Sequence, residues 1–182
     1  MYGQGDPVEL QRDVLATLVP LGDKVVLPEG GQVVVTQSLG GSFTVYYAGN
    51  LARIAGEDAD ALGMTPPPRP QLPDDPADAE VERVVWDQMR TCYDPEIPVD
   101  IVELGLVYRC EITHREDGRR EVAVTMTLTA PGCGMGDVIA DDVRHKIEMV
   151  PTVARATVEV TFEPPWSAEM MTEQARLQTG MF

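Results

Sequence analysis

The sequence predicts an α+β protein, in which a small all-β domain precedes a two-layer domain with the element order α-β-β-α-β-α. Three observations lead to this prediction. Six prolines fall within residues 66–76, and such a stretch forms a stiff, extended spacer. Short β-rich runs separated by glycine turns precede the spacer, whereas helical and strand-like periodicities alternate after it. We therefore predict domains at 1–65 and 77–182, joined by a linker at 66–76.

The first domain is predicted from short runs of β-branched and aromatic residues. Residues 33–36 and 43–46 fit the two arms of a hairpin that turns at Gly40 and Gly41. So many short strands favour closure into a small barrel or roll. The block has no cysteine, no histidine and no convergent carboxylates, so we expect a structural or docking module. The predicted strands are residues 25–27, 32–38, 43–47 and 51–54.

Three helices are expected in the second domain. The first covers residues 77–91, and Asp74 or Asp75 is in position to cap it. The second covers residues 137–149, and a final helix follows Ser167 as its cap. The inward-facing positions at helical spacing are Val81, Val84, Val85 and Met89 in the first helix and Val138, Ile139, Val143 and Ile147 in the second.

Three strands are expected between these helices. They cover residues 106–113, 120–129 and 153–162, and the first two are joined by a turn at 116–118. Strand alternation places one set of side chains from each strand on a common face. These sets are Leu106, Tyr108, Cys110 and Ile112; Val122, Val124, Met126 and Leu128; and Ala156, Val158, Val160 and Phe162.

The composition excludes several classes of function. The net charge is −16 and the isoelectric point is about 4.3, so the surface repels nucleic acids and anionic membranes. No apolar run approaches the ~20 residues of a membrane span, and the polar N-terminus does not resemble a signal peptide. We therefore expect a cytoplasmic protein, in which three cysteines do not indicate a disulfide framework. No phosphate-binding loop motif is present, so nucleotide binding is not expected.

Cys133 is the first candidate for chemistry. It lies in a glycine-rich turn between a predicted strand and a predicted helix, where the backbone can approach a ligand closely. The positive end of the following helix would stabilise a thiolate, which can bind iron or attack an electrophile. The alternative is a buried, inert thiol, and position alone favours neither.

The second candidate is the pair of carboxylates in the Asp-Pro-Glu-Ile-Pro sequence at 94–98. Asp94 and Glu96 flank a proline that fixes the backbone, and they could ligate a hard metal or activate a water molecule. The alternative is a turn in which Asp94 accepts hydrogen bonds from nearby backbone N–H groups, and taken alone the sequence favours this turn.

The remaining cysteines and histidines offer little support for catalysis. Cys110 alternates with apolar residues and is expected to pack in the core, whereas the role of Cys92 stays open. No C-x-x-C spacing supports a closed four-thiolate metal site. His114 lies beside a hairpin turn, and His145 is expected to be a solvated helix residue about 15 Å or more beyond Cys133. We therefore do not expect an enzyme.

Three motifs give a specific resemblance. Residues 93–108 (YDPEIPVDIVELGLVY) resemble the signature of the PaaD-like, metal–sulfur cluster biosynthetic domain. Residues 127–133 (TLTAPGC) resemble its second signature, and the Pro-Pro-Trp sequence at 164–166 with the residues that follow resembles its closing motif. The N-terminal block, in particular 35–45 and 49–54, is similar to the extension of SufT proteins. The sequence is thus identified as a member of the SufT family of iron–sulfur cluster assembly factors.

The resemblance implies a fold like that of the cluster-assembly domain and a role in iron–sulfur protein maturation. It makes Cys133 the family's reactive cysteine and a candidate iron ligand, with Asp94, Glu96, Thr129, Gly132 and Gly134 lining the site. The implied cargo is iron or an iron–sulfur cluster, held transiently. The implied partners are cluster scaffold or carrier proteins and client apoproteins, and a second copy of the chain could form a homodimer.

Three hypotheses follow. The first is a cluster-assembly accessory that binds metal through Cys133, where a second copy or a client completes the coordination because one thiolate cannot hold a cluster alone. The second is a metal-free adaptor that docks the assembly machinery onto clients. The third, a cysteine-dependent enzyme, ranks last because no base is placed beside the thiol.

Overall fold

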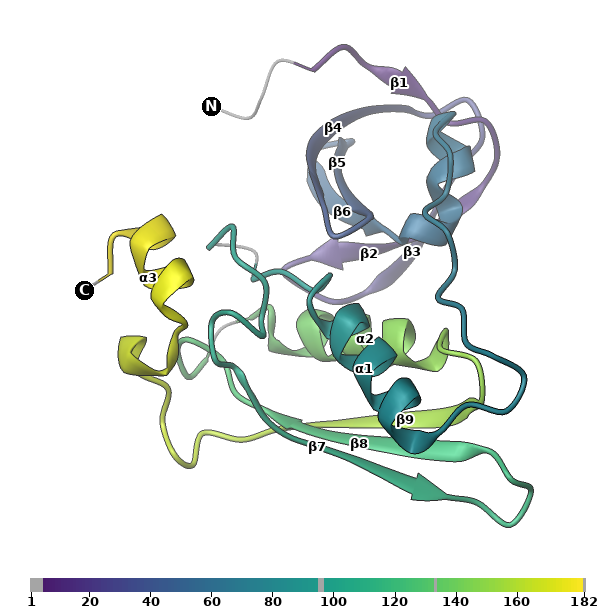
Figure 1. The fold of residues 1–182 in the computed structure, drawn as a ribbon. Helices are drawn as coiled ribbons and strands as arrows, with labels where there is room; N and C mark the ends of the chain where they lie inside the picture. Colours follow the sequence, from purple (N-terminus) through teal and green to yellow (C-terminus); the bar gives the residue numbers. More distant parts are fainter. Residues whose placement is uncertain (1–4, 95–96, 133, 182) are drawn as a thin grey trace. The chain divides into compact units, whose positions relative to one another are not determined.

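The computed structural model describes residues 5–94, 97–132 and 134–181. The chain divides into two compact units, Met1–Pro68 and Arg69–Phe182 (Figure 1). The division falls inside the proline-rich stretch at 66–76.

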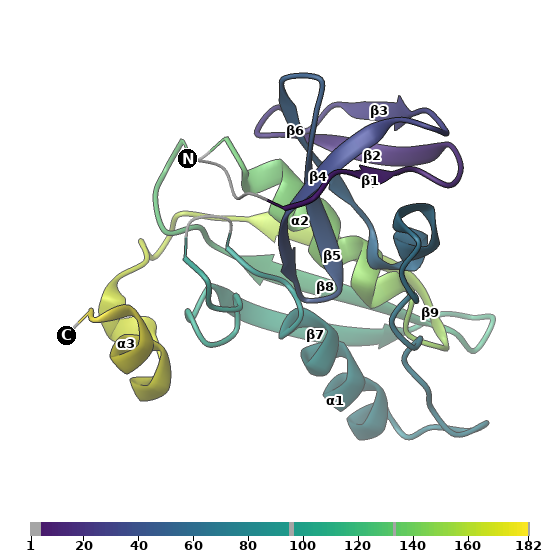
Figure 2. The ribbon, with the colours of Figure 1, turned by 90° about the horizontal axis from the view of Figure 1, so that it is seen from above.

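The first unit is a six-stranded antiparallel sheet followed by a 3-10 helix. The sheet order is β1-β4-β5-β6-β2-β3, and the strands curl into a roll (Figure 1), which Figure 2 shows from above. Residues of the inner face, such as Val33, Val45 and Ile54, are fully buried. The elements are β1 (Val8–Glu9), β2 (Val14–Val19), β3 (Lys24–Leu27), β4 (Gln32–Leu39), β5 (Ser42–Tyr47), β6 (Asn50–Ile54) and η1 (Gly56–Leu62).

The expected hairpin is confirmed, because β4 pairs with β5 across Gly40 and Gly41, and both glycines have positive φ. Strand β2 was not expected from the sequence. Its outward-facing Leu15 pairs with Val26 of β3, and both side chains are more than half exposed. The strand is therefore apolar on both faces, so it lacks the alternation that identifies a half-buried strand.

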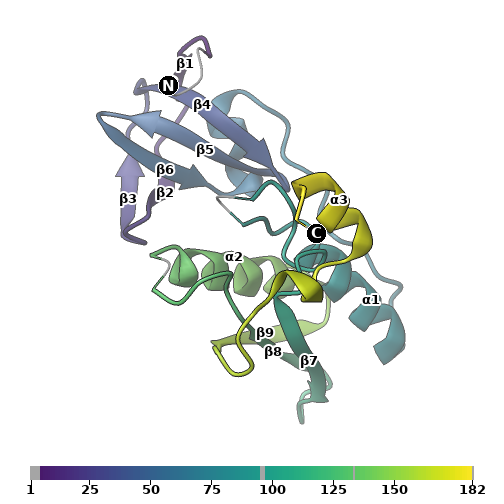
Figure 3. The same cartoon turned by 90° about the vertical axis from the view of Figure 1, so that its left-hand side faces the viewer.

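The second unit has the element order that the sequence predicts. Its three-stranded sheet is ordered β7-β8-β9, with β7 antiparallel and β9 parallel to β8. Helices α1 and α2 lie on the same face of this sheet (Figures 1 and 3). The elements are α1 (Asp78–Met89), β7 (Val107–His114), β8 (Arg120–Met126), α2 (Gly136–Glu148), β9 (Val153–Val160), η2 (Ala168–Met170) and α3 (Glu173–Thr179).

The apolar positions predicted for α1, α2 and β8 form the core of this unit. All twelve of these side chains are less than 10% exposed. They are Val81, Val84, Val85, Met89, Val122, Val124, Met126, Leu128, Val138, Ile139, Val143 and Ile147. Their periodicity is visible in the sequence because each element buries only one face.

Two predicted caps are wrong. Helix α1 begins after Ala77, whose backbone N–H donates to Glu80 Oε2 at 2.9 Å, whereas Asp75 precedes a proline and is therefore kept out of helical geometry. Ser167 starts only the short 3-10 turn η2, without a side-chain cap. Helix α3 is capped instead by Thr172, whose Oγ1 accepts a hydrogen bond from the Ala175 N–H at 3.2 Å.

Two predicted strand faces also need correction. A β-bulge between Val107 and Arg109 interrupts the strand alternation at Tyr108, which lines a pocket together with Arg109 and Thr125. Strand β9 ends at Val160, so Phe162 lies beyond the pairing with β8 and is 38% exposed.

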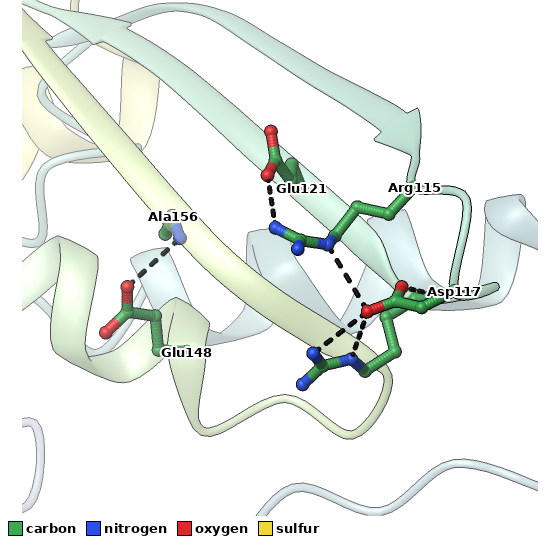
Figure 4. A network of polar contacts seen from close by, with 6 residues as sticks. Arg115, Asp117, Glu121, Glu148 and Ala156 are labelled. Atoms are coloured by element: carbon green, nitrogen blue, oxygen red, sulfur yellow. Dashed lines mark hydrogen bonds and ion pairs between the residues drawn. The ribbon is translucent and has the colours of Figure 1, made fainter.

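The outer edge of β9 is protected by a side chain. Glu148, at the end of α2, accepts a hydrogen bond from the backbone N–H of Ala156 at 3.1 Å (Figure 4). An edge strand presents N–H groups that can pair with a strand of another chain, and this carboxylate occupies one of those donors.

Candidate functional site

One end of the three-stranded sheet gathers the segments that resemble family motifs. Strand β7 begins at the end where the parallel strands β8 and β9 finish, because β7 runs antiparallel to both. Backbone hydrogen bonds join the segments there: Thr127 donates to Leu106 at 2.8 Å, and Thr161 donates to Met126 at 2.8 Å. We call this region the signature end; its segments are residues 97–106, 127–132 and 161–172.

The first segment is a compact loop that precedes β7. Asp94 is buried, and its Oδ1 accepts a hydrogen bond from the Ile97 N–H at 3.0 Å, as the turn interpretation predicted. Asp100 Oδ1 accepts from the backbone N–H groups of Val102 and Glu103, both at 3.0 Å. Burial nevertheless raises the pKa of Asp100 above its usual value. Glu96 lies outside the described residues.

The third segment, residues 161–172, is hydrogen-bonded to the first segment and to the start of β7. We call it the C-terminal strap, and we call these contacts the clasp. The Tyr108 hydroxyl donates to the Pro164 carbonyl at 2.7 Å, and Trp166 Nε1 donates to the Leu104 carbonyl at 2.7 Å. The Thr172 N–H donates to the Glu103 carbonyl at 3.0 Å. The strap thereby fixes the loop that carries the first motif.

Gly105 makes the closest approach in this clasp. Its φ is +72°, a left-handed conformation that favours glycine, and a Cβ atom there would overlap the carbonyl oxygen of Met170. The glycine of the Leu-Gly-Leu sequence in the first motif is therefore required for the loop and the strap to pack closely.

The second segment connects β8 to α2. Thr127 is fully buried, Thr129 is half-buried, and Gly132 and Gly134 are exposed. Gly132 has a φ of +76°, which marks a turn that a residue with a side chain would adopt only with strain. Cys133 lies outside the described residues, and α2 begins three positions later at Gly136.

The two described cysteines lie in different surroundings. Cys92 is fully buried at the end of α1, and its thiol donates weakly to the Gln88 carbonyl at 3.7 Å. Cys110 is half-buried on the edge strand β7 and does not lie in the core. Burial, together with the charges of Glu82 and Glu111, raises the pKa of the Cys110 thiol to about 11. Cys110 is thus a neutral thiol at neutral pH and a poor nucleophile or metal ligand.

The two histidines lie on β7 and on α2. His114 Nε2 lies 2.8 Å from Asp78 Oδ2, at the opposite end of β7. His145 is half-buried on α2, so the expectation of a solvated residue is wrong. Among residues 5–94, 97–132 and 134–181, no three His, Cys, Asp or Glu side chains converge as a metal site. No helix in this part of the chain is both long and apolar enough to cross a membrane.

Sequence reasoning missed the residues that hold the clasp. Glu103, Gly105, Trp166 and Thr172 received no role, although Trp166 lies in the closing motif. Trp166 follows two prolines and precedes the polar Ser167, and a tryptophan is unusual in such a surface segment. This was the signal in the sequence that could have identified its role.

The comparisons with known proteins agree with the motifs. Residues 82–160 match the family model described as "Iron-sulfur cluster assembly protein". A Porphyromonas gingivalis protein named "Fe-S protein maturation auxiliary factor" is 46% identical over 101 residues, which are 56% of this chain and 92% of that protein. The Staphylococcus aureus "Fe-S protein maturation auxiliary factor SufT" is 38% identical over 88 residues, which are 48% of this chain and 96% of the relative.

A similar solved structure is the Bacillus anthracis "Domain of Unknown Function DUF59". It is 36% identical, with a TM-score of 0.49, and the match covers 57% of this chain and 95% of that one. The family model establishes the relationship together with the two relatives, which are matched over 92% and 96% of their own lengths. The chain therefore belongs to the family of iron–sulfur cluster assembly proteins.

Proposed function

We propose that this protein is an accessory factor that assembles iron–sulfur clusters or delivers them to client apoproteins. One observation carries the proposal: 46% identity across 92% of a relative that is named as an iron–sulfur protein maturation auxiliary factor. The gathering of three motif segments at one end of the sheet supports it, because active loops are commonly held there by a rigid scaffold.

In this proposal Cys133 binds the cargo, which is iron or a cluster. Its position three residues before α2, between two exposed glycines, suits a thiolate that a bulky ligand can reach. Asp94, Glu96, Thr129, Gly132 and Gly134 would line the site. Since one thiolate cannot hold a cluster, a client, a carrier or a second copy of the chain would supply the remaining ligands.

The proposal includes no catalytic turnover and no nucleotide. The second unit, a two-layer domain, would carry the cargo site. The first unit, a small barrel or roll of the SufT type, would be a docking module. The partners are scaffold or carrier proteins and client iron–sulfur apoproteins, which meet the protein in the cytoplasm.

Anaerobic reconstitution tests the role of Cys133. The wild type, Cys133→Ser and the matched control Cys110→Ser are incubated with ferrous iron and sulfide, desalted, and assayed for bound iron and visible absorption. We expect the wild type and Cys110→Ser to retain iron, and Cys133→Ser to lose it without a change in circular dichroism. Equal iron in all three proteins, or none in any, would overturn the metal-binding role.

A metal-free adaptor is the second candidate. One observation favours it: among the described residues of the second unit, every exposed large apolar side chain lies in 162–181. An adaptor predicts that Cys133→Ser still supports activation of a client enzyme in cells, whereas the carrier predicts that activation is lost.

A further inference from the structure

The C-terminal part of the second unit presents apolar side chains to solvent. Four large apolar residues of the described surface of this unit are at least 36% exposed, and all of them follow β9. They are Phe162, Met170, Leu177 and Met181. A single exposed apolar residue is ordinary, but a concentration of them in one segment is typical of an interaction site.

Met170 lies in a groove between the strap and the sheet. The groove has a volume of about 740 Å³, which is large enough for several side chains of a bound peptide. Tyr108, Pro164 and Met170 supply apolar walls, and the hydroxyls of Thr125 and Thr161 add polar groups. A methionine wall adapts to apolar side chains of different shapes.

The groove is held in shape before anything binds. Its strap wall is attached to β7 by the hydrogen bond from Tyr108 to Pro164, and to the loop before β7 by that from Trp166 to Leu104. A preformed groove binds without the entropic cost of ordering its own walls.

The charges around the groove favour a basic partner. Glu163 lines the groove, Glu169 and Glu173 are the next acidic residues along the chain, and all three are exposed. The cation in the lining, Arg109, is paired with Glu111 at 2.6 Å. The whole chain carries a net charge of −16, so an acidic partner would be repelled.

We propose that this groove binds an extended segment of a partner protein in which one or two large apolar side chains are flanked by Lys or Arg. The apolar side chains enter beside Met170, and a cation meets Glu163. This proposal rests on the proposed function in one respect, which is that the partners are clients or carriers. Its test uses metal-free protein and so does not depend on iron binding.

A phage-displayed library of random twelve-residue peptides tests the proposal. Selection on the immobilised wild type, after depletion on Met170→Lys, should enrich peptides that combine large apolar residues with Lys or Arg. A synthetic peptide from the selection should bind the wild type at least tenfold more tightly than Met170→Lys in fluorescence anisotropy. Its affinity should fall with added salt.

Matched variants separate the groove from general surface effects. Glu163→Lys changes an exposed residue, and it should weaken binding at least threefold even if Met170→Lys proves poorly folded. Leu21→Lys, at an exposed apolar residue of the first unit, and Glu116→Lys make comparable changes at residues that do not line the groove and should bind within twofold of the wild type. The proposal fails if no peptide is enriched, if the enriched peptides are acidic, or if the groove and control variants bind equally. Iron binding by Cys133 is measured separately, so either proposal can fail alone.

Discussion

The two ends of the three-stranded sheet are built differently. At one end, which we call the turn end, a tight hairpin at residues 115–119 joins β7 to β8, and its charged side chains pair with one another (Figure 4). Arg115 lies 2.7 Å from Glu121, and Arg119 lies 2.9 Å from Asp117. The hairpin of the turn end is thus short, and these two ion pairs lie within residues 115–121.

The signature end uses long segments and backbone contacts. There the loop before β7 and the strap after β9 are joined by side-chain donors, such as Trp166, that reach main-chain carbonyls far away in the sequence. A left-handed glycine, Gly105, permits their close approach. We infer from this difference that the turn end stabilises the fold, whereas the signature end holds loops in a fixed arrangement that suits binding.

Gly105, compared with Gly118, gives the largest expected loss of stability. Gly105→Ala adds a Cβ that would overlap the Met170 carbonyl in a left-handed conformation, so the free energy of unfolding should fall by about 3 kcal/mol. Gly118→Ala meets nothing within 4 Å, and only its φ of +80° adds strain of about 1 kcal/mol. Urea unfolding of both variants measures the difference, and equal losses would show that the clasp contributes no special constraint.

Arginines 119 and 120 provide the next contrast, within the turn end itself. The buried Arg120 donates to Asp78 at 2.8 Å, to the Pro76 carbonyl at 2.8 Å and to Thr152 at 3.0 Å. Arg120→Ala leaves these groups without their donor and should cost about 2–3 kcal/mol.

The neighbouring Arg119 is exposed, so Arg119→Ala should change stability by less than about 0.5 kcal/mol. Thermal unfolding compares the two variants. A similar melting temperature for both would contradict the structural role of Arg120.

The smallest contrast concerns acid. Hydrogen bonds from His114 and then Arg120 lower the pKa of Asp78 at the turn end, whereas burial raises the pKa of Asp100 at the signature end. A lowered pKa stabilises the fold above the unfolded-state value, and this contribution is lost as the pH falls through the folded-state value. A raised pKa has the opposite sign, because folding then favours the protonated carboxyl.

Asp78→Asn should therefore destabilise the protein at pH 7, and its difference from the wild type should shrink as the pH approaches 3. Asp100→Asn should be neutral or slightly stabilising at pH 7. Urea midpoints of both variants between pH 3 and pH 7 test the signs, and a destabilising Asp100→Asn would show that its two backbone hydrogen bonds outweigh burial.

The sequence predicted those parts of the fold in which each element buries one face. Helix α2 and strand β8 were found because Val143, Ile147 and Val124 recur at the period of their element. Strand β2 was missed because it is apolar on both faces, and Tyr108 was misplaced because a bulge interrupts the alternation.

The site was predicted less completely than the fold. Motif resemblance selected segments that the topology brings to one end of the sheet, but nothing in the periodicity indicated how they are joined. The contact from Trp166 to Leu104 spans 62 positions and depends on a backbone carbonyl, which no side-chain pattern reports. The roles of Cys133, Asp94 and Glu96 in binding stay predictions.

Cluster transfer tests the central claim, that the signature end handles the cargo. Reconstituted wild type, Cys133→Ser and the turn-end variant Arg115→Gln are mixed anaerobically with an apo-ferredoxin, and cluster arrival is followed by circular dichroism in the visible range. We expect transfer by the wild type and Arg115→Gln, and none above the rate of free iron and sulfide by a folded Cys133→Ser. Transfer by Cys133→Ser at the wild-type rate would contradict it.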